Sequence, residues 1–212
     1  MVDVVLRDGL SRTERRKATT RSALIRAGQK LLAEGRTDVS VLEITSTADV
    51  GNGSFYNHFA TKTELFDAAV DAVLEAHGTL MDELTARIED PAEAFTQSFR
   101  MTGHLYRRHR ELTLVVLRRG TGILLSEGGL VPRATRDIRV AVAAGRFRVE
   151  DVDLAAAVIV GASLSLGQML LSQPERDVAE TTDAVTRQVL RGMGLPDADV
   201  EDLCSRPLPE VG

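Results

Sequence analysis

The stretch that decides the fold is residues 44–59, ITSTADVGNGSFYNHF, which predicts two short helices around a tight turn. Before the turn, Val41, Ile44 and Ala48 lie at positions i, i+3 and i+7, so they form one apolar stripe. A helix this short is stable only when its stripe packs against other parts of the chain. The pattern therefore predicts the first half of a packed two-helix motif.

The turn itself is Asp49-Val50-Gly51. Asp tolerates a left-handed backbone, and Gly can cap the next helix without a side chain. We therefore expect the chain to reverse direction within three or four residues, with Val50 filling the corner between the two helices.

The second helix should bury Phe55 and Phe59, which lie at i and i+4. Its outer side then carries short hydrogen-bonding groups: Ser54, Tyr56, Asn57 and His58. A polar outer side of this kind, on the second helix of a two-helix corner, is typical of helices that enter the major groove of DNA.

These residues resemble the helix-turn-helix motif of the TetR-like transcriptional regulators. The matching positions are Ile44-Thr45, Ala48-Asp49-Val50, Gly53-Ser54-Phe55-Tyr56, His58-Phe59, Lys62 and Leu65. The sequence departs from the family at Thr45, Asp49 and Gly51, which stand for the usual Ala, Gly, and Ser or Ala. The resemblance implies an all-α protein with a three-helix DNA-binding head and a larger helical body for ligand binding and dimerisation. The partners it implies are double-stranded DNA, a small-molecule effector of unknown identity, and a second copy of the chain.

The candidate DNA contacts fall in two groups. The motif and the polar outer side predict that Tyr56, His58 and Lys62 hold phosphates, whereas Ser54 and Asn57 face base edges. The second group is the basic cluster that precedes the motif: Arg12, Arg15, Arg16 and Lys17. Such a cluster is either a solvated helix end or a set of contacts to the phosphates or the minor groove. We favour the DNA contacts because the two-helix motif follows directly.

Charge is distributed unevenly along the chain. The formal net charge is −5, yet residues 1–62 hold ten Lys and Arg against seven Asp and Glu, and the remainder holds sixteen against twenty-four. All three lysines lie in the first part. A basic N-terminal part beside an acidic remainder is the asymmetry expected when one end meets phosphate.

Four segments follow from the helix signals. Residues 1–10 lack periodicity and are expected to form a flexible arm, and residues 11–62 the DNA-binding head, whose first helix starts at the capping box of Ser11 and Glu14. Residues 63–194 should form the ligand-binding and dimerisation body, with a long first helix and a new start at Pro91. Residues 195–212, rich in proline and acids, are expected to be a mobile tail.

Residues 154–174 carry no charged side chain, a length that would just span a bilayer. Several Gly, Ser and Gln residues interrupt the run, so we favour a helix covered all round by protein over a membrane helix. Ala157, Gly161 and Ser165 form a smooth strip for the close approach of a partner helix, predicted within residues 175–193. The family pairs its last two long helices across a dimer, which assigns the interface to Ala157, Gly161, Ser165, Val185 and Val189.

The ligand site is the least determined part of the sequence. A set of large apolar and aromatic side chains could line a cavity: Phe95, Phe99, Met101, Tyr106, Leu124, Met169 and Leu170. The same spacing also fits an ordinary hydrophobic core. The sequence does not choose between drug, lipid, acyl-coenzyme A and metabolite.

Other classes of function find little support. We find no Gly-x-Ser-x-Gly elbow, no zinc-binding cysteine pair, and no complete phosphate-binding loop among the glycines of residues 120–129. The spacing of His104 and His109 does not suit a metal site on a helix. We therefore expect neither catalysis nor a metal or other cofactor, and a lone Cys204 fits a cytoplasmic protein. The alternative function is a helical ligand-binding or adaptor protein without a DNA role.

Overall fold

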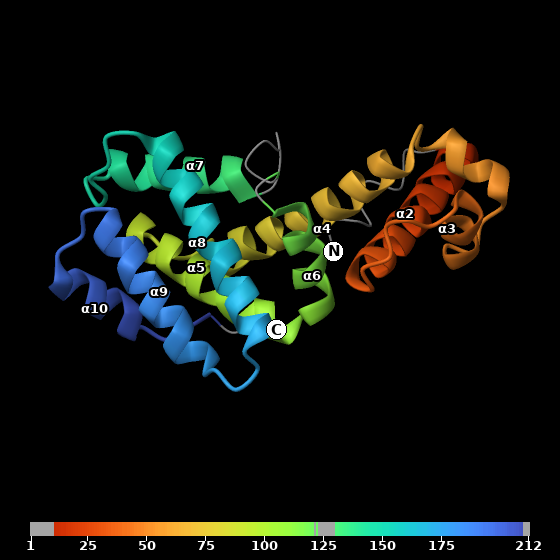
Figure 1. Ribbon diagram of the computed structural model, residues 1–212. Coiled ribbons are helices and arrows are strands. Elements are labelled where there is room, and N and C mark those ends of the chain that lie inside the picture. The colour runs from red at the N-terminus through yellow and green to blue at the C-terminus, as the bar shows by residue number, and fades with distance from the viewer. Residues whose placement is uncertain (1–10, 121, 123–129, 210–212) are drawn as a thin grey trace. The chain divides into compact units, whose positions relative to one another are not determined.

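The computed structural model describes residues 11–120, 122 and 130–209. Every regular element in these ranges is helical, which confirms the predicted all-α fold. The chain divides into two compact units, which we call the head (residues 1–72) and the body (residues 73–212). Figure 1 shows the elements in chain order from α2 to α10. The predicted arm, residues 1–10, lies outside the described residues.

The head contains α2 (Arg12–Ala33), α3 (Val41–Thr47), the 3₁₀ helix η1 (Asn52–Asn57) and the first part of α4 (Lys62–Thr85). The predicted capping box starts α2: the Glu14 amide donates to Ser11 Oγ at 3.3 Å, and the Ser11 amide donates to the Glu14 carboxylate at 2.8 Å. Gly35, with φ of 74°, follows the end of the helix.

One apolar cluster holds these elements together, and it consists of Leu24, Leu31, Val39, Ile44, Phe55, Phe59 and Leu65. Each of these side chains contributes roughly 1.5–3 kcal/mol by leaving water. The cluster confirms the buried positions predicted for the two-helix motif.

The turn between α3 and η1 has the predicted backbone. Asp49 has φ of 53°, and Gly51 occupies the cap position before η1. The second helix is a six-residue 3₁₀ helix. Asn52, Gly53 and Ser54 are poor formers of α-helix, which explains the short element.

Helix α4 differs from the prediction in two respects. The boundary between the units falls after Ala72 rather than at Lys62, because Leu65 belongs to the apolar cluster of the head. The spacing of Leu65, Ala69, Val73, Ala76 and Leu80 predicts one apolar face, but Ala76 is exposed, whereas Val70 and Leu74 are buried. The buried face of α4 therefore does not follow one straight stripe.

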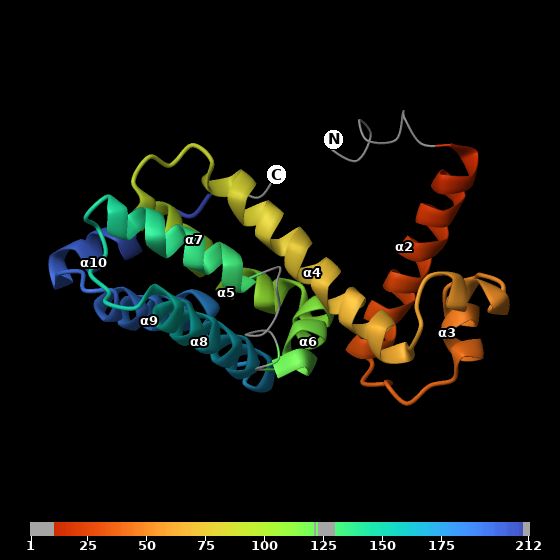
Figure 2. The same ribbon diagram turned by 90° about the horizontal axis from the view of Figure 1, so that it is seen from above.

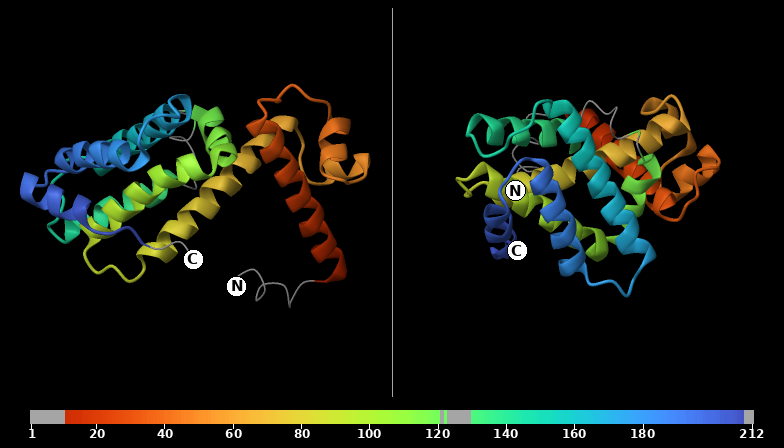
Figure 3. Two further views of the ribbon diagram at one scale, coloured as in Figure 1. Left: turned by 90° about the horizontal axis from the view of Figure 1, so that it is seen from below. Right: turned by 60° about the vertical axis from the view of Figure 1, so that its left-hand side comes forward.

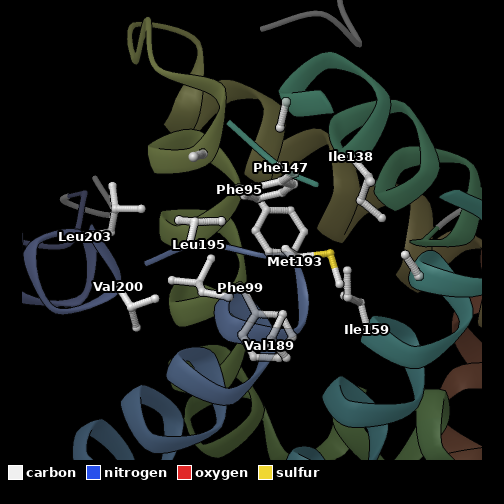
Figure 4. Close-up of a cluster of buried hydrophobic side chains, with 14 of the residues drawn as sticks. Phe95, Phe99, Ile138, Phe147, Ile159, Val189, Met193, Leu195, Val200 and Leu203 are labelled. Atoms are coloured by element: carbon white, nitrogen blue, oxygen red, sulfur yellow. The ribbon is translucent and has the colours of Figure 1, made fainter. Parts of the chain in front are cut away.

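Among the described residues, the body contains the end of α4 and six further helices. They are α5 (Pro91–Arg108), α6 (Arg110–Arg119), α7 (Leu130–Ala143), α8 (Val152–Ser172), α9 (Val178–Gly192) and α10 (Asp197–Ser205). Helix α5 is central, because it contacts each of the helices from α6 to α10. Figure 2 and Figure 3 show α8 and α9 running alongside each other within the body. Figure 4 shows the aromatic centre of its core, where Phe95 meets Phe99 and Phe147.

Helix α8 is the one described helix that is long and apolar enough to cross a membrane by length and composition, and half of its apolar window is buried inside the body. It is not covered all round, as the sequence had suggested, since Leu154 is 63% exposed and Val158 is 60% exposed. A Cβ atom built on Gly161 meets nothing within 4 Å. The smooth strip therefore does not pack against α9 of the same chain.

The prediction of a mobile tail is wrong for residues 197–205. Residues 197–205 form α10, and its inner side buries Val200, Leu203 and Cys204 in the core of the body. Leu195 is buried in the same cluster. Pro196 stands at the cap position and Asp197 in the first turn, which favours a helix start. Proline and acidic residues here mark the beginning of a helix.

Candidate functional site

The predicted recognition residues lie on the surface of the head. Tyr56 is 68% exposed and Asn57 is exposed, while Ser54 and His58 are partly exposed. Phe55 anchors this surface, since its buried ring makes an edge contact with the ring of Tyr56 at 5.3 Å between centroids. The short element η1 is thus held from below and offers its polar side chains outward.

The start of α2 lies beside this element. Lys17 and Arg21 are close enough to His58 to lower its pKa, although burial of the imidazole is the larger cause. The Arg21 guanidinium also lies over the ring of Phe59, at 5.2 Å from its centroid. The head therefore places the two cations Lys17 and Arg21 near His58. The rest of the basic cluster is exposed along α2: Arg12, Arg15 and Arg16.

Lys62 has a structural contact that the sequence did not predict. Its ammonium donates to the carbonyl of Val39 at 2.8 Å and lies 3.8 Å from the Asp38 carboxylate. This bond ties the loop before α3 to the start of α4. An ammonium has three protons, so two donors remain for other acceptors.

The body contains a cavity of about 80 Å³ between α4, α5, α7 and α8. A water molecule needs roughly 10–15 Å³ on this measure, so the cavity has room for a compound of about one ring. Its apolar lining is Met81, Phe95, Phe99, Leu130, Ala134, Ile159 and Val160, and its polar lining is His77, Asp82, Ser98, Thr102, Arg133, Asp137 and Ser163.

Only two of the predicted pocket residues line this cavity, namely Phe95 and Phe99, whose rings stack at 6.4 Å between centroids. Met101 instead packs with Met81 and Leu105, because its position on α5 faces another cluster. Two more residues that were predicted to line the cavity do not: Leu170 is buried in the core, and Met169 is half-buried away from the lining. Leu124 lies outside the described residues.

Charged groups close one side of the cavity. The Arg133 guanidinium makes two hydrogen bonds to Glu75, at 2.7 and 2.9 Å, and one to Asp82 at 3.3 Å. Arg136 lies one turn later on α7. It donates a hydrogen bond to Asp82 at 2.6 Å and forms an ion pair with Asp137 at 2.7 Å. Burial raises the pKa of Asp137, against the opposing effect of Arg136. These ion pairs join α4 to α7.

Gly78 makes this ion-pair arrangement possible. A Cβ atom at Gly78 would come within 2.5 Å of the Arg133 side chain. The glycine therefore leaves room for the guanidinium to lie directly against α4. The missed polar residues had a weak signal in the sequence: His77 falls at i+4 between Val73 and Met81, a polar position within an apolar stripe.

Three of the polar lining residues, His77, Thr102 and Ser163, belong to two hydrogen-bonded pairs. His77 Nε2 lies 3.0 Å from Thr102 Oγ1, and burial, helped by Arg133, lowers the pKa of His77 to about 4. Tyr106 Oη lies 2.7 Å from Ser163 Oγ, and burial raises the pKa of Tyr106 to about 12. Tyr106 was predicted to line the cavity, but it lies one layer behind it.

A second hollow follows the outer side of α8 and α9. It is lined by Leu154, Val158 and Ala162 of α8, and by Val185 and Val189 of α9, among others. Two of the five predicted interface residues, Val185 and Val189, thus border an apolar surface. Ala157 and Gly161 are half-buried and Ser165 is exposed. Within the described ranges, no group of His, Cys, Asp and Glu is arranged to hold a metal ion.

Comparisons with known proteins agree with this arrangement. Residues 24–69 match the family described as bacterial regulatory proteins, tetR family, and residues 90–206 match the family described as tetracyclin repressor-like, C-terminal domain. No curated protein matches the chain significantly in sequence.

Solved structures extend the likeness to nearly the whole chain. The structure of RolR in complex with the ligand resorcinol is 30% identical, with a TM-score of 0.68, and the match covers 94% of this chain and 100% of that one. RolR without ligand is 28% identical over 90% of this chain and 100% of that one, with a TM-score of 0.62. FadR from Bacillus subtilis in complex with stearoyl-CoA, at 16% identity, shares the fold over 81% of this chain and 98% of that one, with a TM-score of 0.65.

The matched segments coincide with the two units of the structure. The first covers the helix-turn-helix motif of the head, and the second covers the helices of the body from α5 to α10. Regulators of this type bind DNA through the N-terminal domain and ligands through the C-terminal domain. The second match alone spans more than half of the chain. The chain therefore belongs to the tetR family of bacterial regulatory proteins.

Proposed function

We propose that the body binds a small hydroxylated aromatic compound in its cavity and that this ligand releases the protein, a repressor, from its operator. The observation that carries the proposal is the lining of the cavity, where two stacked phenylalanines lie near the Asp137 carboxylate. An aromatic ring suits Phe95 and Phe99, and a phenolic hydroxyl suits a carboxylate acceptor. The resorcinol bound to RolR, a relative at 30% identity, is a compound of this class.

The size of the cavity supports a single-ring ligand. About 80 Å³ corresponds to a handful of waters, too little for a long acyl chain such as the stearoyl-CoA of FadR. The polar groups also favour an uncharged ligand, because the charges of Arg133 and Asp82 are already paired with each other. A charged ligand would have to displace one of these partners, which costs more than a hydroxyl contact.

Calorimetry with resorcinol tests the ligand class. We expect the wild-type protein to bind resorcinol, and Asp137→Asn to bind it on the order of ten- to hundredfold more weakly, because a charged acceptor is lost. Asp153→Asn is the matched control, since Asp153 is an exposed carboxylate paired with Arg139 and lies outside the cavity. No binding of resorcinol by the wild-type protein would overturn the proposal.

For the head, we propose that Tyr56, His58, Lys62 and the basic cluster of α2 hold phosphates while Ser54 and Asn57 face base edges. Tyr56 and Asn57 are exposed on η1, and the basic cluster is exposed at the start of α2, which supports this assignment. A dimer would place two heads on successive half-sites of a palindrome, about 34–36 Å apart. In the cytoplasm, a ligand that binds more tightly to the state in which the two heads do not fit the half-sites shifts the population away from the DNA-bound state. A gel-shift titration with resorcinol on the promoter of the protein's own gene checks the release.

For the dimer, we propose that α8 and α9 pair with the same helices of a second copy. The exposed Leu154 and Val158 and the open space above Gly161 support this surface. Gly161→Leu should give monomers in analytical ultracentrifugation, because a bulky side chain would hold the helices apart. Ala76→Leu, at an exposed position of α4, is the control and should leave the dimer intact. A dimeric Gly161→Leu protein would place the interface elsewhere.

A further inference from the structure

The hydroxyl pair behind the cavity has one proton to spare. Tyr106 Oη and Ser163 Oγ share a single hydrogen bond of 2.7 Å, although each hydroxyl carries a proton. In the part of the chain that the structure describes, Ser163 is the only hydrogen-bond partner of the Tyr106 hydroxyl. A phenol is the stronger acid of the two, so Tyr106 donates to Ser163. The proton of Ser163 is then left for another acceptor.

Ser163 also differs from several threonines on the body's helices. Thr96, Thr102 and Thr186 each donate to the carbonyl four residues earlier, at 2.7–2.8 Å. Ser163 makes no such bond among the described residues, and it lines the cavity whereas Tyr106 does not. The spare proton is therefore available at the cavity wall.

The pair of His77 and Thr102 leaves a hydrogen-bond acceptor instead of a donor. Thr102 has one hydroxyl proton, and it lies in the 2.8 Å bond to the Ser98 carbonyl. The oxygen of Thr102 must then accept from His77 Nε2, 3.0 Å away. This assigns the proton of the neutral imidazole to Nε2 and leaves the lone pair on Nδ1. His77 lines the cavity too, and its Nδ1 has no hydrogen-bond partner among the described residues.

We propose that Tyr106 and Thr102 are positioning residues that fix the direction of hydrogen bonding in the cavity, so that Ser163 donates to the ligand and His77 accepts from it. The ligand must then present an acceptor oxygen to α8 and a donor hydroxyl to α4. A dihydroxybenzene satisfies both, because each of its hydroxyls can donate and accept. The inference rests on the proposed function for the identity of the cavity as the ligand site.

This polarity predicts a ranking of three ligands of similar shape. Resorcinol can donate both to His77 and to the Asp137 acceptor of the proposed function, 3-methoxyphenol can donate to one of them, and 1,3-dimethoxybenzene can donate to neither. The loss of one hydrogen bond to a buried group weakens binding by roughly ten- to hundredfold. We expect calorimetry to give this order for the wild-type protein, with 1,3-dimethoxybenzene weakest because it leaves His77 Nδ1 unpaired.

Tyr106→Phe is the decisive variant because it removes a hydroxyl that does not touch the ligand. Without the phenol, Ser163 can turn its proton to the carbonyl of its own helix, so resorcinol should bind roughly tenfold more weakly. Ser163→Ala should cause a similar loss, and the double variant should lose no more than either single one, because both act through one contact. Full additivity of the two losses, or no loss with Tyr106→Phe, would overturn the Ser163 arm.

Thr102→Val tests the His77 arm. Without its acceptor, the imidazole can change tautomer, and the preference for resorcinol over 1,3-dimethoxybenzene should shrink about tenfold. Thr96→Val is the matched control, since this buried threonine on the same helix bonds only the Ala92 carbonyl and does not line the cavity. It should bind all three compounds as the wild-type protein does.

The tautomer of His77 separates this inference from the proposed function. In ¹⁵N-edited spectra of the ligand-free protein, we expect the proton of His77 on Nε2, and on either nitrogen in Thr102→Val. A proton on Nδ1 in the wild-type protein would overturn the His77 arm whether or not resorcinol binds. If the wild-type protein binds none of the three compounds, the proposed function and the ligand polarity are both wrong, even with the expected tautomer.

Discussion

The head and the body place their functional groups in opposite ways. In the head, the candidate DNA contacts are exposed side chains from two short segments, residues 12–21 and 54–62. In the body, the candidate ligand contacts are polar groups from four helices that line one cavity, with His77 and Ser163 more than eighty positions apart in the sequence. The head therefore depends on its core only for support, whereas the core of the body contains its site.

The largest effect we predict is a loss of stability of the head alone. Phe55→Ala removes a fully buried ring from the cluster under η1 and should lower the stability of the head by about 3–5 kcal/mol. Specific DNA binding in a gel-shift assay should be lost. Resorcinol binding by calorimetry should remain, because no residue of the cavity lies in the head.

The neighbouring residue is the control. Tyr56→Ala removes an exposed ring, so thermal unfolding should change by no more than about 0.5 kcal/mol while DNA binding weakens. An equal loss of resorcinol affinity with Phe55→Ala would show that the two units do not fold independently, and the contrast drawn between them would be wrong.

The same contrast explains what the sequence could predict. The motif of residues 44–59 is local, so helix periodicity and turn chemistry were enough to predict the burial of Phe55 and Phe59 and the left-handed Asp49. The start signals at Ser11 and Pro91 were equally local, and both helices start there.

The cavity could not be predicted in this way. Its polar lining comes from α4, α5, α7 and α8, and no local pattern tells that Asp137 and Ser163 share a wall with His77. Large apolar residues were the wrong signal, because Met101 and Leu170 fill ordinary core. The prediction for the tail was wrong for another reason: its composition suggested mobility, whereas Val200 and Leu203 lie at helical spacing and are buried on the inner side of α10.

The second prediction concerns pH and the body alone. The pKa of His77 is about 4 in the folded protein, against an ordinary value of 6.5. The unfolded chain therefore binds a proton that the folded chain refuses as the pH falls below 6.5. The contribution of the neutral His77 to the free energy of unfolding is fully present above pH 6.5. It falls by about 3 kcal/mol as the pH falls to 4. Chemical unfolding of the body, followed from pH 7 to 4, measures this loss.

Other groups near His77 titrate over the same range, so a difference measurement is needed. Arg133 stays charged, but the carboxylates of Glu75, Asp82 and Asp137 face the same region. His77→Gln keeps an amide for Thr102 and does not titrate. The wild-type protein should lose more stability than this variant between pH 6.5 and 4, and parallel curves would contradict the burial argument. The head, without this residue, should not show the difference.

The third prediction compares two glycines at helix contacts. A Cβ atom at Gly103 of the body would lie 2.3 Å from Thr182 Oγ1, whereas one at Gly28 of the head would lie 3.2 Å from the Cβ of Ala69. Gly103→Ala should destabilise the body by about 1–3 kcal/mol through overpacking. Gly28→Ala should be nearly neutral, because alanine favours the helix by about 1 kcal/mol and offsets the small displacement.

The coupling between Gly103 and Thr182 checks the physical reason. Thr182→Ala removes the atoms that the new methyl group would meet, and the Thr182 hydroxyl has no hydrogen-bond partner among the described residues. The double variant Gly103→Ala/Thr182→Ala should therefore be more stable in thermal unfolding than the sum of the single effects predicts. Additive losses would mean that the two helices move apart instead of clashing at this point.

The smallest effect we predict separates two lysines of the head by salt dependence. Lys17 is exposed beside His58, whereas the ammonium of Lys62 already holds the Val39 carbonyl. Lys17→Ala should lower the slope of log affinity against log salt by about 0.9, with unchanged stability, because one phosphate contact is lost. Lys62→Ala should lower the slope by a similar amount and also lower the stability of the head by about 1 kcal/mol, since it removes a hydrogen bond that joins the loop before α3 to α4. Filter-binding isotherms on operator and random DNA, beside thermal unfolding of the free protein, measure both quantities. If Lys62→Ala lowers stability but leaves the slope unchanged, its ammonium serves the fold alone, and the phosphates are held by the residues at the start of α2.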